Sequence, residues 1–206
     1  VSKKNIIPLG GYPLISYSIA AAVLSKSIER IFVSTDSEEF AEIALSFGAE
    51  VPFLRPEEYA QDHSTDREYI LHAMEWFQKH EGKLPEYWVH LRPTSPLREP
   101  KKIDEAIQKI LDQPEATSLR SGHPCAESPY KWFMMEENGY FHGIRPDDKR
   151  PEYYNLPRQA FPPIYIPDGY VDVLKTSHMM NHTSLHGENI LGYVSPVCFE
   201  VDTQEE

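Results

Sequence analysis

The chain has 206 residues, of which 40% are hydrophobic and 25% charged, and this composition is that of an ordinary soluble globular protein with one sizeable core. Its formal net charge of −12 argues against a nucleic-acid-binding protein, because affinity for a phosphate backbone needs a basic face. The longest purely apolar stretch, Ile19 to Leu24, is too short to cross a bilayer, so we expect no membrane association.

The first third of the chain alternates predicted helices and strands. Pro13 followed by LISYSIAAAVLSKS predicts a helix over about 13–26, and RIFVS at 30–34 predicts a strand. A second helix is predicted for SEEFAEIALSFG, which has acidic residues in its first turn and Gly48 as a stop signal. Residues 51–54 can form a short strand.

The middle third continues the alternation. Thr65 and Glu68 form a capping box that opens an amphipathic helix, and the strand YWVHL follows it. A helix is predicted over about 101–112 and a strand at TSLRS. This alternation predicts an α/β domain spanning 1–206, with a mostly parallel sheet and helices on both faces. Ligands bind such sheets at the carboxyl ends of strands, which places 34–36 and 92–98 at the ligand edge.

Residues 123–165 differ in character, being rich in proline and aromatic residues. The segment KWFMMEENGYFHGI predicts a hairpin that turns at Asn138–Gly139. We interpret 123–165 as a protruding subdomain whose aromatic residues form a partner surface. The chain then returns through GYVDVLKTS and YVSPVCFEV.

Three constellations of chemically reactive residues compete. His178, His182 and His186 would align on a helix as metal ligands, although NHTS and Gly187 favour a solvated helix or turn. Nucleophilic catalysis is not supported, because the chain has no GxSxG motif and neither Cys125 nor Cys198 has a recognisable His-paired context. The two cysteines form no CxxC pair, which favours a reducing cytoplasm over a disulfide framework.

The third constellation is a pair of carboxylates near the end of the chain. If FEVDT forms a strand, Glu200 and Asp202 face the same way and present their oxygens to one point. Magnesium is commonly held by one or two carboxylates together with substrate phosphates. Alternating acidic residues on a strand are more often an exposed face, so both interpretations stay open at this point.

Several motifs, in order and spacing, resemble one family over nearly the whole chain. They are KNIIPLGGYPLISYSI, RIFVSTDSEEFAEIALSFGAEV, FLRPEEYAQDHST, LRPTSPLR, LPRQAFPP and VDTQEE. Together these motifs resemble the acylneuraminate cytidylyltransferase family, the synthetases of CMP-activated sialic and related nonulosonic acids. The resemblance implies a Rossmann-like, three-layer nucleotidyltransferase (GT-A-like) fold with a small protruding dimerisation subdomain.

The resemblance also assigns nucleotide-binding positions. Family members begin with a strand and a basic loop around the CTP phosphates, and only the end of that loop is expected here, as Lys4 and Asn5. Lys4 is thereby a catalytic candidate. The other implied nucleotide-binding residues are Arg55, Ser64, Thr65, Arg92, Pro93, Thr94 and Ser95. Two prolines would stiffen the 92–98 loop as the floor of the site, and Arg98 is expected to be structural.

The remaining implied positions concern metal and sugar. Asp202 matches a magnesium-binding, catalytic aspartate, and Glu200 stands where many members have a second aspartate. Sugar-binding positions are implied at Lys131, Arg158, Gln159 and Asp168. The first three would reach the site of the neighbouring subunit, which implies a homodimer with the subdomain as its arm.

The expected reaction is nucleotidyl transfer from CTP to an acid sugar with Mg²⁺. Many members have Gln in place of Arg92 and Asn in place of Asp168, so a GTP-using enzyme, or one acting on legionaminic acid, pseudaminic acid or 3-deoxy-octulosonate, is an alternative. A catalytically inactive nucleotide-sugar binding or dimerisation module is the alternative from a different class.

Overall fold

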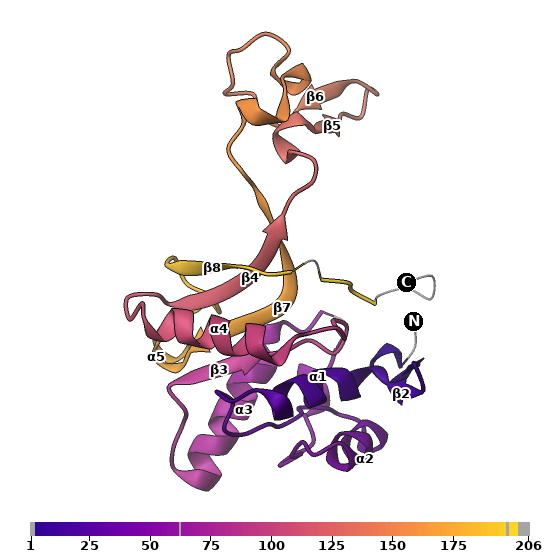
Figure 1. Cartoon of the computed structure of the whole chain (residues 1–206), viewed down its shortest axis with the longest axis vertical. Coiled ribbons are helices and arrows are strands. Elements are labelled where there is room, and N and C mark those ends of the chain that lie inside the picture. Colours follow the sequence, from indigo (N-terminus) through magenta and orange to yellow (C-terminus); the bar gives the residue numbers. More distant parts are fainter. Residues whose placement is uncertain (1–2, 62, 197, 202–206) are drawn as a thin grey trace.

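A computed structural model describes residues 3–61, 63–196 and 198–201 of the chain. Figure 1 shows an α/β body from which an arm projects, with the strands β4 (Ser118–Pro124) and β7 (Tyr165–Lys175) forming the stalk between them. In the described residues, no helix is both long and apolar enough to cross a membrane.

The central sheet has four strands in the order β3-β7-β4-β8. Strand β3 (Tyr87–His90) pairs antiparallel with β7, which pairs antiparallel with β4. Strand β8 (Ile190–Val194) pairs parallel with β4. Next to this sheet, residues 31–35 and 50–54 run parallel to each other and meet in bridges at Phe32–Glu50 and Thr35–Leu54.

The sheet is therefore mixed, whereas the sequence predicted a mostly parallel one. The difference comes from β7, because a chain that returns from the arm must run back along the stalk, and it enters the sheet between β3 and β4. The predicted strands at 30–34 and 51–54 are present as isolated bridges, and residues 198–201 lie outside any strand.

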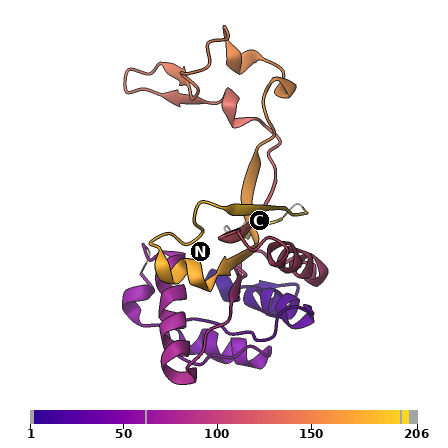
Figure 2. The same ribbon diagram turned by 90° about the vertical axis from the view of Figure 1, so that its left-hand side faces the viewer.

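Helices cover both faces of the sheet, as Figure 2 shows, which confirms the three-layer prediction. Helices α1 (Leu14–Leu24) and α4 (Pro100–Leu111) pack on one face, where Val171 and Val173 of β7 join their core cluster. Helices α3 (Asp66–Glu81) and α5 (Thr176–Asn181) pack on the other face around Leu174. Helix α2 (Glu38–Ser46) packs beside α1. This alternation along β7 follows from the two-residue period of a strand.

Local signals in the sequence define several helix ends. The amide of Thr65 donates to Glu68 at 2.6 Å, which confirms the capping box of α3, and Gly82 ends the helix with φ 69°. Gly10 and Gly11 form the turn between β1 (Pro8–Leu9) and β2 (Tyr12–Pro13). The short 3₁₀ helices η1 (Lys4–Ile6) and η2 (Glu57–Tyr59) lie in the connecting segments.

The arm contains the predicted hairpin and a small aromatic core. Strands β5 (Phe133–Met135) and β6 (Phe141–Gly143) are antiparallel, and Gly139 in their turn has φ 83°. The remaining arm elements are η3 (Pro129–Lys131), η4 (Tyr153–Asn155) and η5 (Arg158–Ala160). The Phe133 and Tyr154 rings lie 4.8 Å apart, and Tyr153 is buried.

Arg98 locks the loop at 91–99 to the body. Its side chain donates to the carbonyl oxygens of Ser95 at 2.6 Å and of Arg92 and Gly169 at 2.8 Å. It also donates to the carbonyl of Tyr170 and to Ser18 Oγ. Burial lowers the pKa of Arg98 to about 10, so the guanidinium stays charged at neutral pH. One side chain thus joins the loop to β7 and α1, which confirms its expected structural role.

Replacing this guanidinium should destabilise the protein strongly. In Arg98→Lys a single ammonium cannot reach all five acceptors, and we expect the free energy of unfolding to fall by about 2–4 kcal/mol because buried carbonyls lose their donors. Urea denaturation followed by circular dichroism measures this change. The control is Arg150→Lys in the arm, whose side chain is 46% exposed and pairs with Asp148. A comparable loss in this control would contradict the role assigned to Arg98.

Candidate functional site

Three predicted nucleotide-binding residues line one open cavity at the carboxyl ends of the strands. The cavity has a volume of about 1030 Å³ and extends into the body between residues 31–35 and β3. Its polar end is lined by Asn5, Arg55 and Pro93 together with Ser34, Thr35 and Asp36. The structure therefore places these residues, which are distant in sequence, around one opening at the predicted ligand edge.

Arg55 supplies a fixed positive charge at this opening. Its Nε donates to Ser34 Oγ at 3.1 Å, another guanidinium nitrogen donates to the Ser34 carbonyl, and the guanidinium lies 4.4 Å from the centre of the Tyr69 ring. Burial lowers the pKa of Arg55 from its ordinary value, but the nearby Asp36 and Asp66 oppose that effect. The hydrogen bonds of this cation go to neutral groups and its face lies on an aromatic ring, while the carboxylates of Asp36 and Asp66 lie nearby.

Arg92, in contrast, is held between two carboxylates. Its Nη2 donates to Asp66 at 2.6 Å and its Nη1 to Asp172 at 3.1 Å. Burial works to lower the pKa of Arg92, but the charges of Asp172 and Asp66 outweigh it and hold the pKa above its ordinary value. The side chain of Asp172 is only 1% exposed, so this arginine neutralises a buried charge.

Tyr69 and His90 complete the cluster. The Tyr69 hydroxyl donates to Asp66 at 2.7 Å and lies 3.0 Å from His90 Nε2. Burial works to raise the pKa of Asp66, but the bond from Tyr69 and the charge of Arg92 together hold it below its ordinary value. Burial, together with the positive charge of Arg92, lowers the pKa of His90 to about 4. His90 is therefore a neutral imidazole at physiological pH.

The end of the described chain reaches the same loop. The amide of Val201 donates to the Thr94 carbonyl at 2.9 Å. A carbon added to Gly169, whose φ is +61°, would meet Arg92 Cδ and Glu200 Oε1 at 3.3 Å each, so both side chains lie over this glycine. Glu200 is thereby at the predicted edge, although not on the predicted strand. Asp202 lies outside the described residues.

The predicted histidine series does not converge. Helix α5 ends at Asn181, so it does not extend to His186. The ring centroids of His178 and His182 lie 4.6 Å apart, whereas His186 Nδ1 lies 3.3 Å from Ser118 Oγ. Of the three, only His182 is exposed, whereas His178 is buried and its ring lies 3.1 Å from Ser184 Oγ, so neither the aligned metal ligands nor a fully solvated helix describes the series. Within residues 3–61, 63–196 and 198–201, no group of three or more His, Cys, Asp or Glu side chains is arranged to hold a metal ion.

Of the predicted sugar-binding residues, Lys131, Arg158 and Gln159 lie on the arm, away from this edge, whereas Asp168 directly precedes Gly169 beside the loop. Asp168 is buried at the root of the stalk, where Ser121 Oγ donates to it at 2.7 Å, the Tyr170 amide at 3.1 Å, and Ser195 also donates. Lys131 lies in η3 and Arg158 and Gln159 in η5, all on the arm, so one chain does not bring them to the 92–98 loop. A sugar contact by any of the four stays a prediction.

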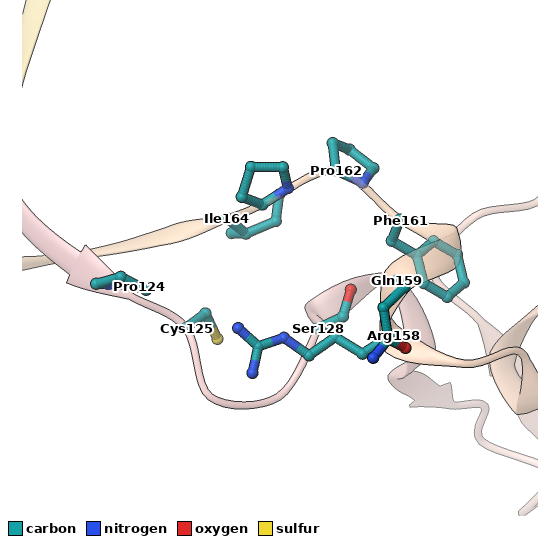
Figure 3. A pocket seen from close by; sticks show the side chains of 9 residues that line it. Pro124, Cys125, Ser128, Arg158, Gln159, Phe161, Pro162 and Ile164 are labelled. Carbon is teal, nitrogen blue, oxygen red and sulfur yellow. The ribbon is translucent and has the colours of Figure 1, made fainter.

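Arg158 and Gln159 line a second, smaller cavity where the arm meets the stalk. Figure 3 shows Arg158 opposite Cys125 and Ile164 in this cavity of about 350 Å³. Arg158 Nη1 donates to the Ala126 carbonyl at 3.2 Å. The guanidinium is thus oriented by backbone and has no carboxylate partner in the described chain.

Lys4, Ser64, Thr65 and Ser95 do not line the large cavity. Lys4 and Asn5 belong to η1, Ser64 Oγ accepts from the Gln61 amide at 3.0 Å, and Thr65 is the N-cap of α3. Ser95 is fully buried under the loop, which fits a loop floor better than a direct nucleotide contact.

Our sequence analysis missed Asp66, Tyr69 and Asp172. The capping box could have shown that Asp66 and Tyr69 lie one turn apart at the start of α3. Asp172 interrupts the apolar run GYVDVL, and an acidic residue inside a buried strand indicates a partner cation.

The low pKa of His90 predicts acid sensitivity. Because the free imidazole has a pKa near 6.5, the unfolded chain takes up this proton before the folded one, and stability is complete above pH 6.5 and falls as the pH drops toward 4. Between pH 6.5 and pH 4, the free energy of unfolding should fall by roughly 2–3 kcal/mol less in His90→Gln than in the unaltered protein. Urea denaturation at each pH measures this difference. An unchanged pH slope, or an equal change in the control His63→Gln at an exposed position, would contradict this assignment.

The chain is similar in sequence to several named enzymes. The chain is 40% identical over 105 residues to the N-acylneuraminate cytidylyltransferase of Escherichia coli O18:K1:H7, a match that covers 51% of this chain and 24% of the relative. It is 39% identical over 105 residues to the CMP-N,N'-diacetyllegionaminic acid synthase of Legionella pneumophila, covering 51% of this chain and 45% of the relative. The match thus spans less than half the length of either relative.

A solved structure supports the same fold. The structure of CMP:2-keto-3-deoxy-manno-octonic acid synthetase complexed with CTP superposes with a TM-score of 0.69 at 15% identity, covering 98% of this chain and 87% of that one. The family model described as cytidylyltransferase matches residues 1–154, which is most of the chain. The chain therefore belongs to the cytidylyltransferase family, and the relatives to which it is similar include an N-acylneuraminate cytidylyltransferase and a CMP-N,N'-diacetyllegionaminic acid synthase.

Proposed function

We propose that the protein transfers the cytidylyl group of CTP to a nonulosonic, sialic-type acid sugar, giving the CMP-sugar and pyrophosphate. The observation that carries the proposal is the polar end of the large cavity, where Asn5, Arg55 and Pro93 meet at the carboxyl edge of the sheet. The activities named for the relatives support it.

In this reaction the anomeric hydroxyl oxygen of the sugar forms a bond to the α-phosphorus of CTP, and the bond from that phosphorus to the pyrophosphate oxygen breaks. The hydroxyl proton goes to solvent. No covalent enzyme intermediate is needed, so catalysis rests on positioning and charge neutralisation. Arg55 and Lys4 would hold phosphate oxygens, and the rigid 92–98 loop would support the nucleotide from below.

Magnesium is the implied cation. Glu200 offers the hard oxygen donors that Mg²⁺ prefers, and the Val201–Thr94 hydrogen bond fixes its segment to the loop beside the opening. We propose that Glu200 and Asp202 hold this ion. When bound, the ion would neutralise negative charge on the phosphates.

The base preferred by the site is cytosine rather than guanine in this proposal. Arg92, the residue that departs from the family pattern, donates to both Asp66 and Asp172, so its guanidinium is oriented by two carboxylates of the protein itself. An arginine that neutralises buried carboxylates is a poor reader of a base.

The arm would form a homodimer. On the hairpin, Met135 lies directly opposite Phe141, and these side chains are 70% and 66% exposed. Exposed apolar side chains gathered on one face mark an interaction surface. A second chain placed there would bring Lys131, Arg158 and Gln159 toward the site of its partner, where they suit a carboxylate.

We place the enzyme in the cytoplasm, where the free thiols of Cys125 and Cys198 stay reduced.

The direct test is pyrophosphate release with Mg²⁺ from the full-length protein. CTP and GTP are each combined with sialic, legionaminic and pseudaminic acids and with 3-deoxy-octulosonate. We expect release with CTP and one nonulosonic acid. Pyrophosphate release only with GTP would contradict the preference for cytosine and would indicate that Arg92 selects the base. No release from a folded dimer would favour a binding module without catalysis.

The carboxylate assignment predicts a loss of turnover in Asp202→Asn and Glu200→Gln. Each change removes one negative oxygen donor, and we expect kcat to fall by at least about tenfold, with partial recovery at higher Mg²⁺ concentration. The control is Glu188→Gln, an exposed acid in the loop before β8. Full activity of both site variants would refute the metal assignment.

The dimer assignment predicts that charge on one face of the hairpin separates the subunits. We expect the double variant Met135→Glu and Phe141→Glu to sediment as a monomer, because two buried carboxylates would lack partners. The matched control changes Met134, which lies opposite His142 on the other face of the same hairpin, to Glu. Dissociation by the control alone would mean that the opposite face forms the contact.

A further inference from the structure

Three neighbouring strands of the central sheet carry one row of polar side chains. In the strand register, Asp172 of β7 lies directly between His90 of β3 and Arg120 of β4. Directly opposite residues share a face of a sheet, so these three side chains, here called the polar row, lie on the same face. Leu174, two residues further along β7, packs against α3 and α5, so this is the face that those two helices cover.

Every member of the polar row has a buried polar atom without a hydrogen bond. Among the described residues, His90 Nδ1, Asp172 Oδ1 and Arg120 Nε have no hydrogen-bond partner. Asp172 is almost completely buried, and its Oδ1 lies 3.7 Å from Arg120 Nε, which is an ion-pair distance but too long for a hydrogen bond. Buried polar groups are nearly always hydrogen-bonded, so three such atoms in adjacent positions indicate a site for a polar ligand.

The polar row is open to solvent at Arg120. The side chain of Arg120 is 36% exposed. Gly192 of β8 lies directly beside it, and a carbon added to this glycine would meet no described atom within 4 Å. Ile190 and Val194, on either side of Gly192, are exposed as well. This end of the sheet face is therefore uncovered in the described chain, and a small molecule can approach Arg120 there.

The other end of the polar row adjoins the predicted metal position. Arg92 donates to Asp172 at 3.1 Å, and the side chains of Arg92 and Glu200 both lie over Gly169. In the proposed function, Glu200 marks the reaction centre, where the sugar oxygen bonds to the α-phosphorus. The sugar therefore has to lie beside this carboxylate, from which the polar row extends across the sheet toward Gly192.

We propose that the polar row binds a substituent of the acid sugar that both donates and accepts hydrogen bonds, namely a hydroxyl or an acylamino group. This inference rests on the proposed function. The row selects such a group because the Asp172 carboxylate only accepts hydrogen bonds, whereas the Arg120 guanidinium only donates them. A sugar carboxylate would pair with Arg120 but would be repelled by Asp172. Arg120 thus contacts the sugar from within the same chain, in addition to the contacts proposed for the arm of a second chain.

The test is the kinetics of Arg120→Met in the intact protein, with CTP, Mg²⁺ and the acid sugar that the unaltered protein turns over fastest. We expect KM for the sugar to rise at least about tenfold while KM for CTP stays within about twofold, because methionine keeps much of the side-chain length but has no donors. Arg120→Lys keeps a cation beside Asp172 and should raise KM for the sugar less. An unchanged KM for the sugar in Arg120→Met, or an equal rise in KM for CTP, would overturn the proposal.

The matched control is Arg30→Met. Arg30 is a comparably exposed arginine that pairs with Glu50 and Glu81 at the opposite end of residues 31–35. We expect this variant to leave KM for the sugar unchanged. A rise equal to that of Arg120→Met would contradict a specific sugar contact.

Sugar binding, measured by saturation-transfer NMR with CTP and Mg²⁺ present, separates this inference from the proposed function. Binding that Arg120→Met abolishes, without pyrophosphate release from the unaltered protein, would support the polar row and reject the transfer reaction. No binding of sialic, legionaminic or pseudaminic acid or of 3-deoxy-octulosonate to the unaltered protein would overturn the polar row as a sugar site. A loss confined to the first three sugars assigns the acylamino group, and an equal loss for 3-deoxy-octulosonate, which has only hydroxyls, assigns a hydroxyl.

Discussion

The buried guanidinium of Arg98 is the interaction on which the site depends. Five acceptors from the loop, from β7 and from α1 surround it, and none is a carboxylate. A planar cation with five donors is the one side chain that can satisfy so many carbonyls at one point. The loop that follows β3 is therefore held to the body by polar contacts at its centre.

Charge is distributed unevenly around the opening. Arg92 donates hydrogen bonds to the carboxylates of Asp66 and Asp172, whereas Arg55 donates to the hydroxyl and carbonyl of Ser34 and packs on the Tyr69 ring. The two arginines therefore differ in their partners: Arg92 neutralises charge that folding has buried, whereas the hydrogen bonds of Arg55 go to neutral groups. Under the proposed function, Arg92 would build the site and Arg55 would contact the nucleotide.

Much of this arrangement could be predicted from sequence, and the reasons for success and failure are physical. The helices, the capping box at Thr65 and the Asn138–Gly139 hairpin depend on local chemistry, and all three are confirmed. The antiparallel insertion of β7 could not be predicted from periodicity, because a strand has the same alternation in either direction. The Asp66–Arg92–Asp172 cluster joins residues distant in sequence, and only their shared burial reveals it.

The root of the stalk has a mechanical consequence. The β4–β7 ribbon shifts register between Arg120 and Gly122, a carbon added to Gly122 would meet the Ile166 carbonyl at 2.8 Å, and the side chains of Ser121 and Ser195 converge on Asp168 beside this irregularity. A ribbon two strands wide bends and twists easily, so a small rotation at its base becomes a large displacement at its tip. The hydrogen bonds to Asp168 restrain the base of the ribbon, so a few polar contacts far from the tip determine the orientation of the whole arm.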